Sequence, residues 1–220
     1  MRRAVPFVAS TMVLTFAAPA FAHRVDEYLQ ATTISVEKER VLAQIRLTPG
    51  TEVFPTVLAA IDTDRDGVLS SAEQRTYAQH VLGDLSLSVD GERLALRLLA
   101  SSFSDLDAMR DGRGVIQIEF EAAVPRGGSD RRLVFENHHF GRIADYLVNA
   151  LVPSDPAISI RSQSRDSLQS RFQLDYGQAG ARPGPSSLGW WAGVRAWLGA
   201  LVLLPVAWLL TRRDPRSRAT

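Results

Sequence analysis

Residues 115–124 read Val-Ile-Gln-Ile-Glu-Phe-Glu-Ala-Ala-Val, and apolar and polar side chains alternate along them. A period of two is typical of a β-strand that has one face in a core and the other in water. The face expected in the core carries Ile116, Ile118, Phe120 and Ala122, and the face expected in water carries Gln117, Glu119 and Glu121. This stretch favours a mainly β fold.

The same alternation recurs on both sides of this stretch. Residues 27–49 predict a hairpin of two strands, joined by the polar turn at residues 37–40. Further strands are expected at residues 85–89, 94–98, 133–139, 145–152, 158–164 and 170–174, and a short helix or loop at residues 103–112. About eight short strands at regular spacing predict a β-sandwich, which a chain of this size can fold without disulfides.

Between the second and third strands, a helix-loop-helix pattern at residues 52–82 interrupts the alternation. Its centre, residues 62–73, reads Asp-Thr-Asp-Arg-Asp-Gly-Val-Leu-Ser-Ser-Ala-Glu. Carboxylates on alternate residues can converge on one point, and the glycine in sixth position permits the sharp turn between them. The loop predicts one calcium ion, held by the side chains of Asp62, Asp64, Asp66, Ser70 and Glu73 and by the backbone carbonyl of Val68.

The spacing of this loop resembles the EF-hand family, and the resemblance covers the loop and its flanking helices only. Apolar residues recur at helical spacing on both sides, and they are Phe54, Val57, Leu58 and Ile61 before the loop and Ala72, Tyr77, Ala78 and Val81 after it. The alternative is a loop that has lost its ion and in which Glu73 and the serines cap the second helix. Residues 105–116 do not repeat the pattern, so one isolated site is expected, which argues against a calmodulin-like opening.

Both ends of the sequence are expected to lie outside the β-domain, which we place at residues 23–177. Residues 1–22 resemble a secretory signal peptide, with two arginines, an apolar stretch and a small-residue cleavage site that ends at Ala22. The alternative for this segment is an uncleaved anchor helix. The remaining segments predict a linker at residues 178–187, a transmembrane helix at residues 188–210 and a basic tail at residues 211–220.

The arginines of the tail place it in the cytoplasm by the positive-inside rule, so the main domain would lie in the periplasm, held at the inner membrane by one helix. The alternatives for residues 188–210 are a buried core helix and a sorting tail that is later removed. Calcium is abundant outside the cytoplasm, and even a weak site would stay filled there. The ion is therefore expected to fix the two helices on the sandwich and to stabilise the fold, rather than to act as a sensor.

The composition excludes several classes of function. The chain contains no cysteine and one lysine, Lys38, so disulfides, thiolate metal sites and a cysteine nucleophile are excluded. Residues 1–22 and 188–220 hold seven arginines and one acidic residue, which leaves 18 basic and 23 acidic residues between them. This acidic middle argues against nucleic acid as a partner. Catalytic motifs are missing from the sequence, so we expect no enzyme, and an exported enzyme of unknown reaction is the third hypothesis.

The four histidines support a second hypothesis. His23 would become the mature N-terminus, where its free amine and imidazole can chelate Cu²⁺ or Ni²⁺. His138 or His139 could complete such a site, although their side chains would point to opposite faces of a strand. His80 is expected at the surface of the second helix. The alternative function is thus a Cu/Ni-handling protein, set against the simpler interpretation that these are ordinary surface histidines.

A wider resemblance covers most of residues 22–176. It is carried by Ala22-His23, the strand at residues 28–36, Thr48-Pro49, the calcium loop, Val89-Asp90-Gly91, Phe135-Glu136-Asn137-His138-His139 and Tyr146-Leu147-Val148-Asn149. The order of these motifs resembles a group of bacterial exported proteins of uncharacterised function, to which the last two motifs belong, and more loosely the extracytoplasmic domain of nickel/cobalt transporters. One expected membrane helix is too few for a translocation path. The resemblance therefore implies a binding or accessory module that acts beside a metal transporter or another protein.

Overall fold

The computed structural model describes residues 26–180, and within them the chain forms ten strands and three helices. The first sheet has the order β5 (Arg97–Phe103), β6 (Ile116–Ala123), β2 (Arg40–Pro49), β1 (Tyr28–Val36) and β8 (Ala144–Ala150). The second sheet has the order β4 (Glu92–Arg93), β3 (Leu85–Val89), β7 (Asp130–Asn137), β10 (Arg171–Gln178) and β9 (Ile158–Arg165). The helices are α1 (Phe54–Ile61), α2 (Ser71–Gly83) and α3 (Leu106–Arg110).

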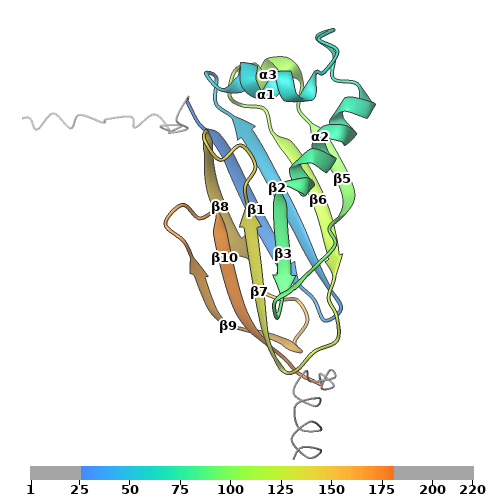
Figure 1. Ribbon diagram of the computed structural model, residues 1–220, viewed down its shortest axis with the longest axis vertical. Helices are drawn as coiled ribbons and strands as arrows, with labels where there is room; N and C mark the ends of the chain where they lie inside the picture. The colour runs from blue at the N-terminus through green and yellow to red at the C-terminus, as the bar shows by residue number, and fades with distance from the viewer. Residues whose placement is uncertain (1–25, 181–220) are drawn as a thin grey trace, which may run out of the picture.

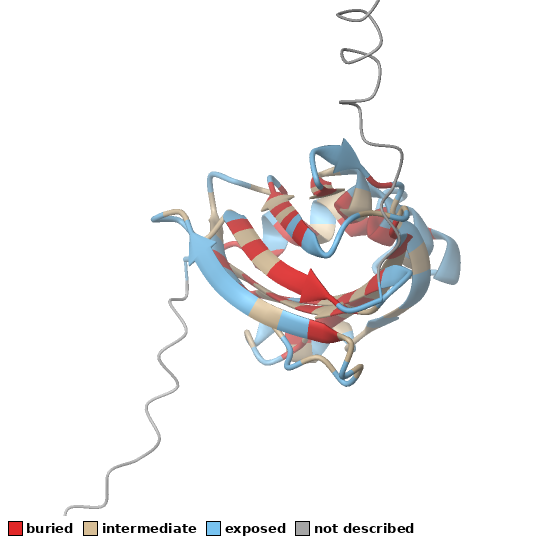
Figure 2. Cartoon of the chain, turned by 90° about the horizontal axis from the view of Figure 1, so that it is seen from below, coloured by how far each residue is buried: buried red, intermediate tan, exposed pale blue. Residues whose placement is uncertain are grey.

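The two sheets lie face to face (Figure 1). Apolar side chains of both sheets belong to one core cluster. Figure 2 shows that buried residues alternate with less buried ones along the strands. The largest buried side chains come from both sheets, among them Phe120 on β6, Phe135 on β7 and Phe172 on β10. Burial of an apolar side chain of this kind stabilises a fold by about 1.5–3 kcal/mol. The mainly β fold predicted from the alternation is confirmed.

Strand β6 has the two faces that its sequence predicts. The four residues expected in the core, Ile116, Ile118, Phe120 and Ala122, are all buried. Ile118 lies opposite Ile45 of β2 in the antiparallel register. On the other face, Glu121 accepts a hydrogen bond from Nε of Arg97 on β5 at 3.1 Å. Alternation in the sequence therefore reports the burial of this strand correctly.

Strand β8 differs from the other strands because it runs parallel to its neighbour, β1. The other strand pairs within residues 26–180 are antiparallel. After β7 ends at Asn137 in the second sheet, the chain crosses to the first sheet through residues 138–143. The crossing is joined to β1 by a hydrogen bond from the N–H of Tyr28 to the carbonyl of Ile143, 2.7 Å long. This crossing brings His139 into the core, where its ring contacts that of Tyr28.

The prediction of a strand at residues 94–98 is wrong. Strand β4 ends at Arg93, and β5 begins at Arg97 in the other sheet, where it pairs with β6. Leu94 is buried and Leu96 is partly buried, because the chain keeps its leucines against the core while it crosses between the sheets. Alternation reports burial here, and it does not show that a residue belongs to a sheet.

The helix-loop-helix unit lies at one end of the two sheets, together with α3 (Figure 1). The two helices bury the predicted apolar residues Phe54, Val57, Ile61, Tyr77, Ala78 and Val81. Ala72 differs from the prediction because it is exposed, and the first turn of α2 buries Glu73 instead. The first turn of α2 is thus held by a polar residue.

No helix within residues 26–180 is long and apolar enough to cross a membrane. The predicted signal peptide, transmembrane helix and basic tail lie outside the described residues. Strand β10 continues to Gln178, the first residue of the predicted linker. The N–H of Gln178 donates to the carbonyl of Ser129 at 2.8 Å. In Figure 1, β10 ends at the end of the sheets that lies opposite the helices.

Candidate functional site

The acidic loop joins the two helices of the helix-loop-helix unit. Asp62 is the C-cap of α1, and Asp64 and Asp66 follow it at alternate positions. One carboxylate oxygen of each residue lies within 4.8 Å of those of the other two. Three convergent carboxylates form a donor set for a hard cation such as Ca²⁺ or Mg²⁺. These three predicted ligands therefore come together, and they could hold a metal ion.

Hydrogen bonds inside the loop hold the three carboxylates in this arrangement. Asp64 Oδ1 accepts from the N–H of Asp66 at 3.2 Å, and Asp66 Oδ1 accepts from the N–H of Val68 at 2.7 Å. Asp62 Oδ2 accepts from the N–H of Gly67 at 3.1 Å. Gly67 has a φ of 77°, a left-handed conformation that glycine adopts without steric cost. The sixth position thus makes the sharp turn that its glycine predicts.

Asp62 provides the strongest sign that the loop takes a cation. The residue is 6% exposed, and its Oδ1 atom has no hydrogen-bond partner among the described residues. A buried carboxylate oxygen is destabilising unless a donor or an opposite charge compensates for its lost hydration. A cation shared with Asp64 and Asp66 would supply this compensation.

The ionisation of Asp64 shows how closely negative charge is gathered in the loop. The hydrogen bond from the Asp66 N–H lowers the pKa of the Asp64 carboxyl, but lost hydration and the charges of Asp66 and Glu73 outweigh it and leave the pKa raised. Neighbouring like charges favour the neutral acid. A divalent cation would reverse this preference, because it stabilises the ionised carboxylates.

Glu73 is engaged differently from the three aspartates. Ser70 is the N-cap of α2, and its Oγ accepts from the N–H of Glu73. The Glu73 carboxylate accepts in return from the N–H of Ser70 at 3.0 Å and from the N–H of Thr63 at 2.7 Å. Hydrogen bonds from Ser70, and then from Thr63, lower the pKa of Glu73 to about 2. Glu73 is therefore an ionised member of a capping box.

Five of the six predicted ligands fall into two groups, and Val68 belongs to neither. Asp62, Asp64 and Asp66 form the convergent cluster, whereas Ser70 and Glu73 cap α2, as the alternative interpretation expects. Val68 is exposed, which suits a residue that contributes only its backbone carbonyl. The two interpretations of the loop are compatible, because the cap fixes its second half while the carboxylates of its first half face one another.

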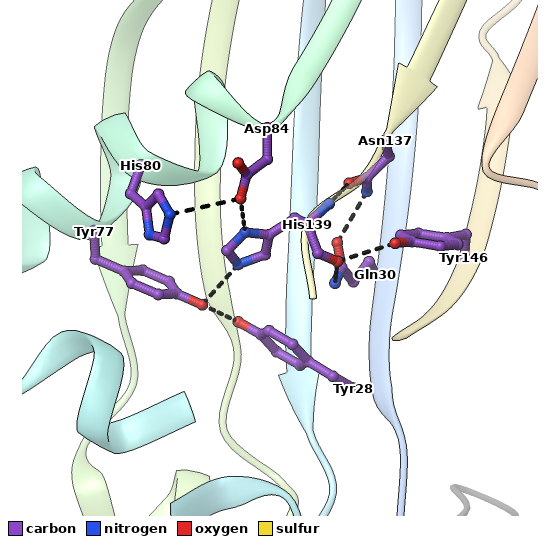
Figure 3. A network of polar contacts seen from close by, with 8 residues as sticks. All are labelled: Tyr28, Gln30, Tyr77, His80, Asp84, Asn137, His139 and Tyr146. Carbon is purple, nitrogen blue, oxygen red and sulfur yellow. Dashed lines mark hydrogen bonds and ion pairs between the residues drawn. The ribbon is translucent and has the colours of Figure 1, made fainter. Parts of the chain in front are cut away.

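A second polar cluster lies in the core beside α2 (Figure 3). The hydroxyls of Tyr28 on β1 and Tyr77 on α2 share a hydrogen bond of 2.8 Å. The Tyr77 hydroxyl lies 3.0 Å from Nε2 of His139, whose Nδ1 lies 2.8 Å from Oδ2 of Asp84. We call these four residues the buried relay.

Hydrogen bonds to its backbone hold His139 in place within the relay. Gln30 Nε2 and the Tyr146 hydroxyl both donate to the His139 carbonyl, at 2.8 Å and 3.0 Å. Asn137 Oδ1 accepts from the His139 N–H at 2.9 Å, and Asn137 Nδ2 donates to Gln30 Oε1 at 2.9 Å. Both backbone groups of this buried residue are thereby satisfied.

Burial decides the protonation states in the relay. Lost hydration lowers the pKa of His139 although Asp84 opposes the change, and lost hydration raises the pKa of Tyr28 and of Tyr77. These three side chains are therefore neutral near pH 7. Because the Asp84 carboxylate is an acceptor, Nδ1 of His139 carries the ring proton and Nε2 accepts from Tyr77. The donors then run in one direction, from Tyr28 through Tyr77 and His139 to Asp84.

The relay meets water at its Asp84 end. Tyr28, Tyr77 and His139 are at most 1% exposed. The Asp84 side chain is 34% exposed and lies 3.7 Å from the more exposed ring of His80. A chain of tyrosine, histidine and aspartate can in principle move a proton, but a general acid or base has to reach its substrate. In this structure the rings are enclosed, so the relay holds the fold together.

The structure separates the histidines that could hold copper or nickel. Both ring nitrogens of His139 are engaged in the relay, whereas the His138 side chain is 69% exposed and lies 3.8 Å from Glu136. This agrees with the expectation that at most one of the two rings faces a given site. His80 is exposed on α2, as predicted. His23 lies outside the described residues.

The sequence contains little signal for the buried relay. Its contacts join residues that are 49, 62 and 55 positions apart. Tyr28 and Tyr77 read as ordinary core residues of a strand and a helix. A buried tyrosine hydroxyl usually requires a partner, and this requirement is the one signal that could have linked them to a polar residue elsewhere.

No protein-family model and no curated protein matches this sequence. The acidic loop and the buried relay are therefore interpreted from their own chemistry. For the loop that chemistry is a set of oxygen donors, and for the relay it is a set of satisfied hydrogen bonds.

Proposed function

We propose that this chain is an exported, membrane-anchored protein whose β-domain binds one Ca²⁺ in the acidic loop and serves as a binding or accessory module. The buried Oδ1 of Asp62 carries the proposal, because it has no hydrogen-bond partner among the described residues and lies in a group of three carboxylates. A loop that served only as a helix cap would leave this oxygen uncompensated.

Calcium suits the loop better than magnesium. Ca²⁺ takes about six to eight oxygens in flexible geometry, including backbone carbonyls, whereas Mg²⁺ requires a near-ideal octahedron and keeps several waters. The loop can offer three carboxylates and the carbonyl of Val68, with water completing the shell. The Glu73 carboxylate would join them by giving up a hydrogen bond from Ser70 or Thr63 and contacting the ion instead. The negative charge of Glu73 already helps to raise the pKa of Asp64.

The role of the ion in this proposal is structural. The loop joins α1 to α2, and the buried residues of both helices belong to the same core as the sheets. An ion that binds only the folded chain stabilises it by about 2.7 kcal/mol at a concentration of about 100 times Kd. Calcium outside the cytoplasm is abundant enough to keep even a weak site filled, although the gain in stability is smaller for a weaker site.

The sequence patterns at the two ends support export and a membrane anchor. Strand β10 ends opposite the helices (Figure 1). An anchor that follows β10 and a short linker would therefore leave the acidic loop on the side of the domain away from the membrane.

Calorimetric titration of the whole chain in detergent tests the calcium site. We expect one Ca²⁺ per chain and weaker binding of Mg²⁺. Asp62→Asn keeps an acceptor for the Gly67 N–H but removes the buried charge, and we expect it to abolish binding. Asp107→Asn is the matched control, because Asp107 is an exposed aspartate paired with Arg110 outside the loop. An unaltered chain that binds no Ca²⁺ would leave the loop as a helix cap only.

A further inference from the structure

We infer that α2 couples the acidic loop to the buried relay, so that Tyr77 and His139 are positioning residues for the metal site. This coupling rests on the proposed function, because it concerns what sets the affinity of the loop for Ca²⁺. Neither residue touches the ion site. Each would act through the helix that carries Glu73.

The same helix takes part in both features. At its start, Glu73 closes the loop by accepting from the N–H of Thr63. Tyr77 follows four residues later, on the same face of the helix, and both side chains are buried. At its end, the C-cap Asp84 contacts His139. A rotation or shift of α2 that moves Tyr77 therefore moves Glu73 with it.

The relay attaches α2 to both sheets. Tyr77 is bonded to Tyr28 on β1 of the first sheet and to His139 just after β7 of the second sheet. The Asp84 carboxylate contacts the His139 ring, and the Asp84 carbonyl accepts from the N–H of His138 at 3.1 Å. Apolar packing alone allows a helix to slide or rotate slightly. Directional hydrogen bonds to two sheets fix its position.

Helix α2 depends on these hydrogen bonds more than α1 does. The buried residues of α1 are all apolar, namely Phe54, Val57 and Ile61. Those of α2 are Glu73, Tyr77, Ala78 and Val81, of which one is charged and one is small. Tyr77, Ala78 and Val81 pack α2 into the core, and the hydroxyl of Tyr77 adds directional hydrogen bonds that the apolar buried residues of α1 cannot make.

The ligands of the loop come from both sides of the helix-loop-helix unit. The three aspartates follow α1, whereas Glu73 belongs to α2, so their relative positions depend on where α2 is held. When the relay holds α2 in place, the loop loses less conformational entropy on binding an ion, and the affinity is higher. By thermodynamic reciprocity, an ion in the loop stabilises the relay.

Tyr77→Phe tests the coupling, because it removes one hydroxyl, retains the ring and leaves the loop unchanged. Calcium titration of the whole chain should give a Kd about fivefold weaker, at the lower end of typical coupling. Tyr176→Phe is the matched control, since Tyr176 is a buried tyrosine of β10 whose hydroxyl has no hydrogen-bond partner among the described residues and takes no part in the relay. We expect this control to leave Kd unchanged. Tyr28→Phe, which shortens the relay, should weaken binding less and serves if Tyr77→Phe does not fold.

A reciprocal readout comes from the ring of His139. Nitrogen NMR of this ring should show a change in chemical shift when Ca²⁺ is added to the unaltered chain, because the ion further restrains α2 and with it the contact between Nδ1 and Asp84. The shift should be absent in Asp62→Asn. A residue that contributed only to general stability would show no response to calcium.

Three results would overturn the coupling, and they can be told apart. Equal calcium affinity in the unaltered chain, Tyr77→Phe and Tyr28→Phe would overturn the coupling and leave the calcium site standing. An equally weakened affinity in Tyr176→Phe would show a general effect of removing a buried hydroxyl in place of coupling through α2. An unaltered chain that does not bind Ca²⁺ would overturn the proposed function together with the coupling.

Discussion

The acidic loop precedes α2, the buried relay contacts α2 from its middle to its C-terminal end, and the two are built in opposite ways. The loop draws its donors from twelve consecutive residues, and one of its buried oxygens, Oδ1 of Asp62, has no partner among the described residues. The relay draws on three segments that are distant in sequence, and each hydroxyl and ring nitrogen in it has a partner. The loop thus retains a buried oxygen that a cation could compensate, whereas the hydrogen bonds of the relay are satisfied within the protein. This difference supports the proposal that the loop binds an ion and that the relay holds the fold.

The largest effect is expected when the relay is broken at its centre. His139→Ala removes both ring hydrogen bonds and leaves a cavity at a fully buried position. We expect a loss of about 3 kcal/mol or more in the free energy of unfolding, measured with urea. His138→Ala is the control, because its side chain is exposed, and it should change stability by less than about 0.5 kcal/mol. Similar losses in the two variants would contradict the role given to the relay.

Glu73→Gln sharpens the comparison at the loop, because Glu73 belongs to the cap and its negative charge also acts on Asp64. Glutamine can keep the capping box but carries no charge. We expect calcium affinity to fall about tenfold, while stability in the presence of a chelator falls by less than about 1 kcal/mol. Calorimetry and thermal unfolding measure the two quantities. An unchanged calcium affinity would remove Glu73 from the ligand set and leave it in the cap alone.

Acid should weaken the relay before it weakens the cap. Burial lowers the pKa of His139 below 6.5, so the unfolded chain takes up this proton first and stability falls as the pH drops below 6.5. One proton gives at most about 1.4 kcal/mol per pH unit. The pKa of Glu73 is lowered from 4.5 to about 2, so its contribution is present above pH 4.5 and is lost toward pH 2.

Urea unfolding over a range of pH checks this order. His139→Gln should remove the step below pH 6.5, and Glu73→Gln should remove the step below pH 4.5. His80→Gln is the control for the exposed neighbouring ring and should retain both steps. Stability that stays constant from pH 6.5 down to pH 4.5 would contradict a neutral, buried His139.

The smallest effect is expected at the helix cap. Ser70→Ala removes the side chain that accepts from the N–H of Glu73, and it should cost about 0.5–1 kcal/mol in thermal unfolding with a chelator present. Ser71→Ala is the neighbouring control, because Ser71 is exposed, and it should have almost no effect. Calcium affinity should fall less in Ser70→Ala than in Glu73→Gln. The reverse order would make Ser70 the more important ligand.

The parts of the molecule that could be predicted from sequence are those with local signals. The two faces of β6 follow from the alternation of Ile116, Ile118 and Phe120, and the cluster of aspartates follows from their spacing around Gly67. Both depend on residues a few positions apart. A strand face and a turn are decided within such distances.

The parts that could not be predicted depend on long-range packing. The leucines at 94 and 96 are placed against the core, yet their alternation does not say that the chain is leaving one sheet for the other. The relay depends on the crossing between β7 and β8, which carries His139 to Tyr28 and Tyr77. The sequence close to any one of these residues does not indicate that the chain crosses between the sheets there.

Thermal unfolding of the whole chain, with calcium and with a chelator, tests most directly whether the acidic loop is a calcium site. The melting temperature should rise with calcium in the unaltered chain and in Asp107→Asn, and it should not rise in Asp62→Asn. In the presence of the chelator, Asp62→Asn should be at least as stable as the unaltered chain, because the substitution removes a buried charge that no partner among the described residues compensates. A rise of equal size in Asp62→Asn, or no rise in the unaltered chain, would contradict a calcium ion in this loop.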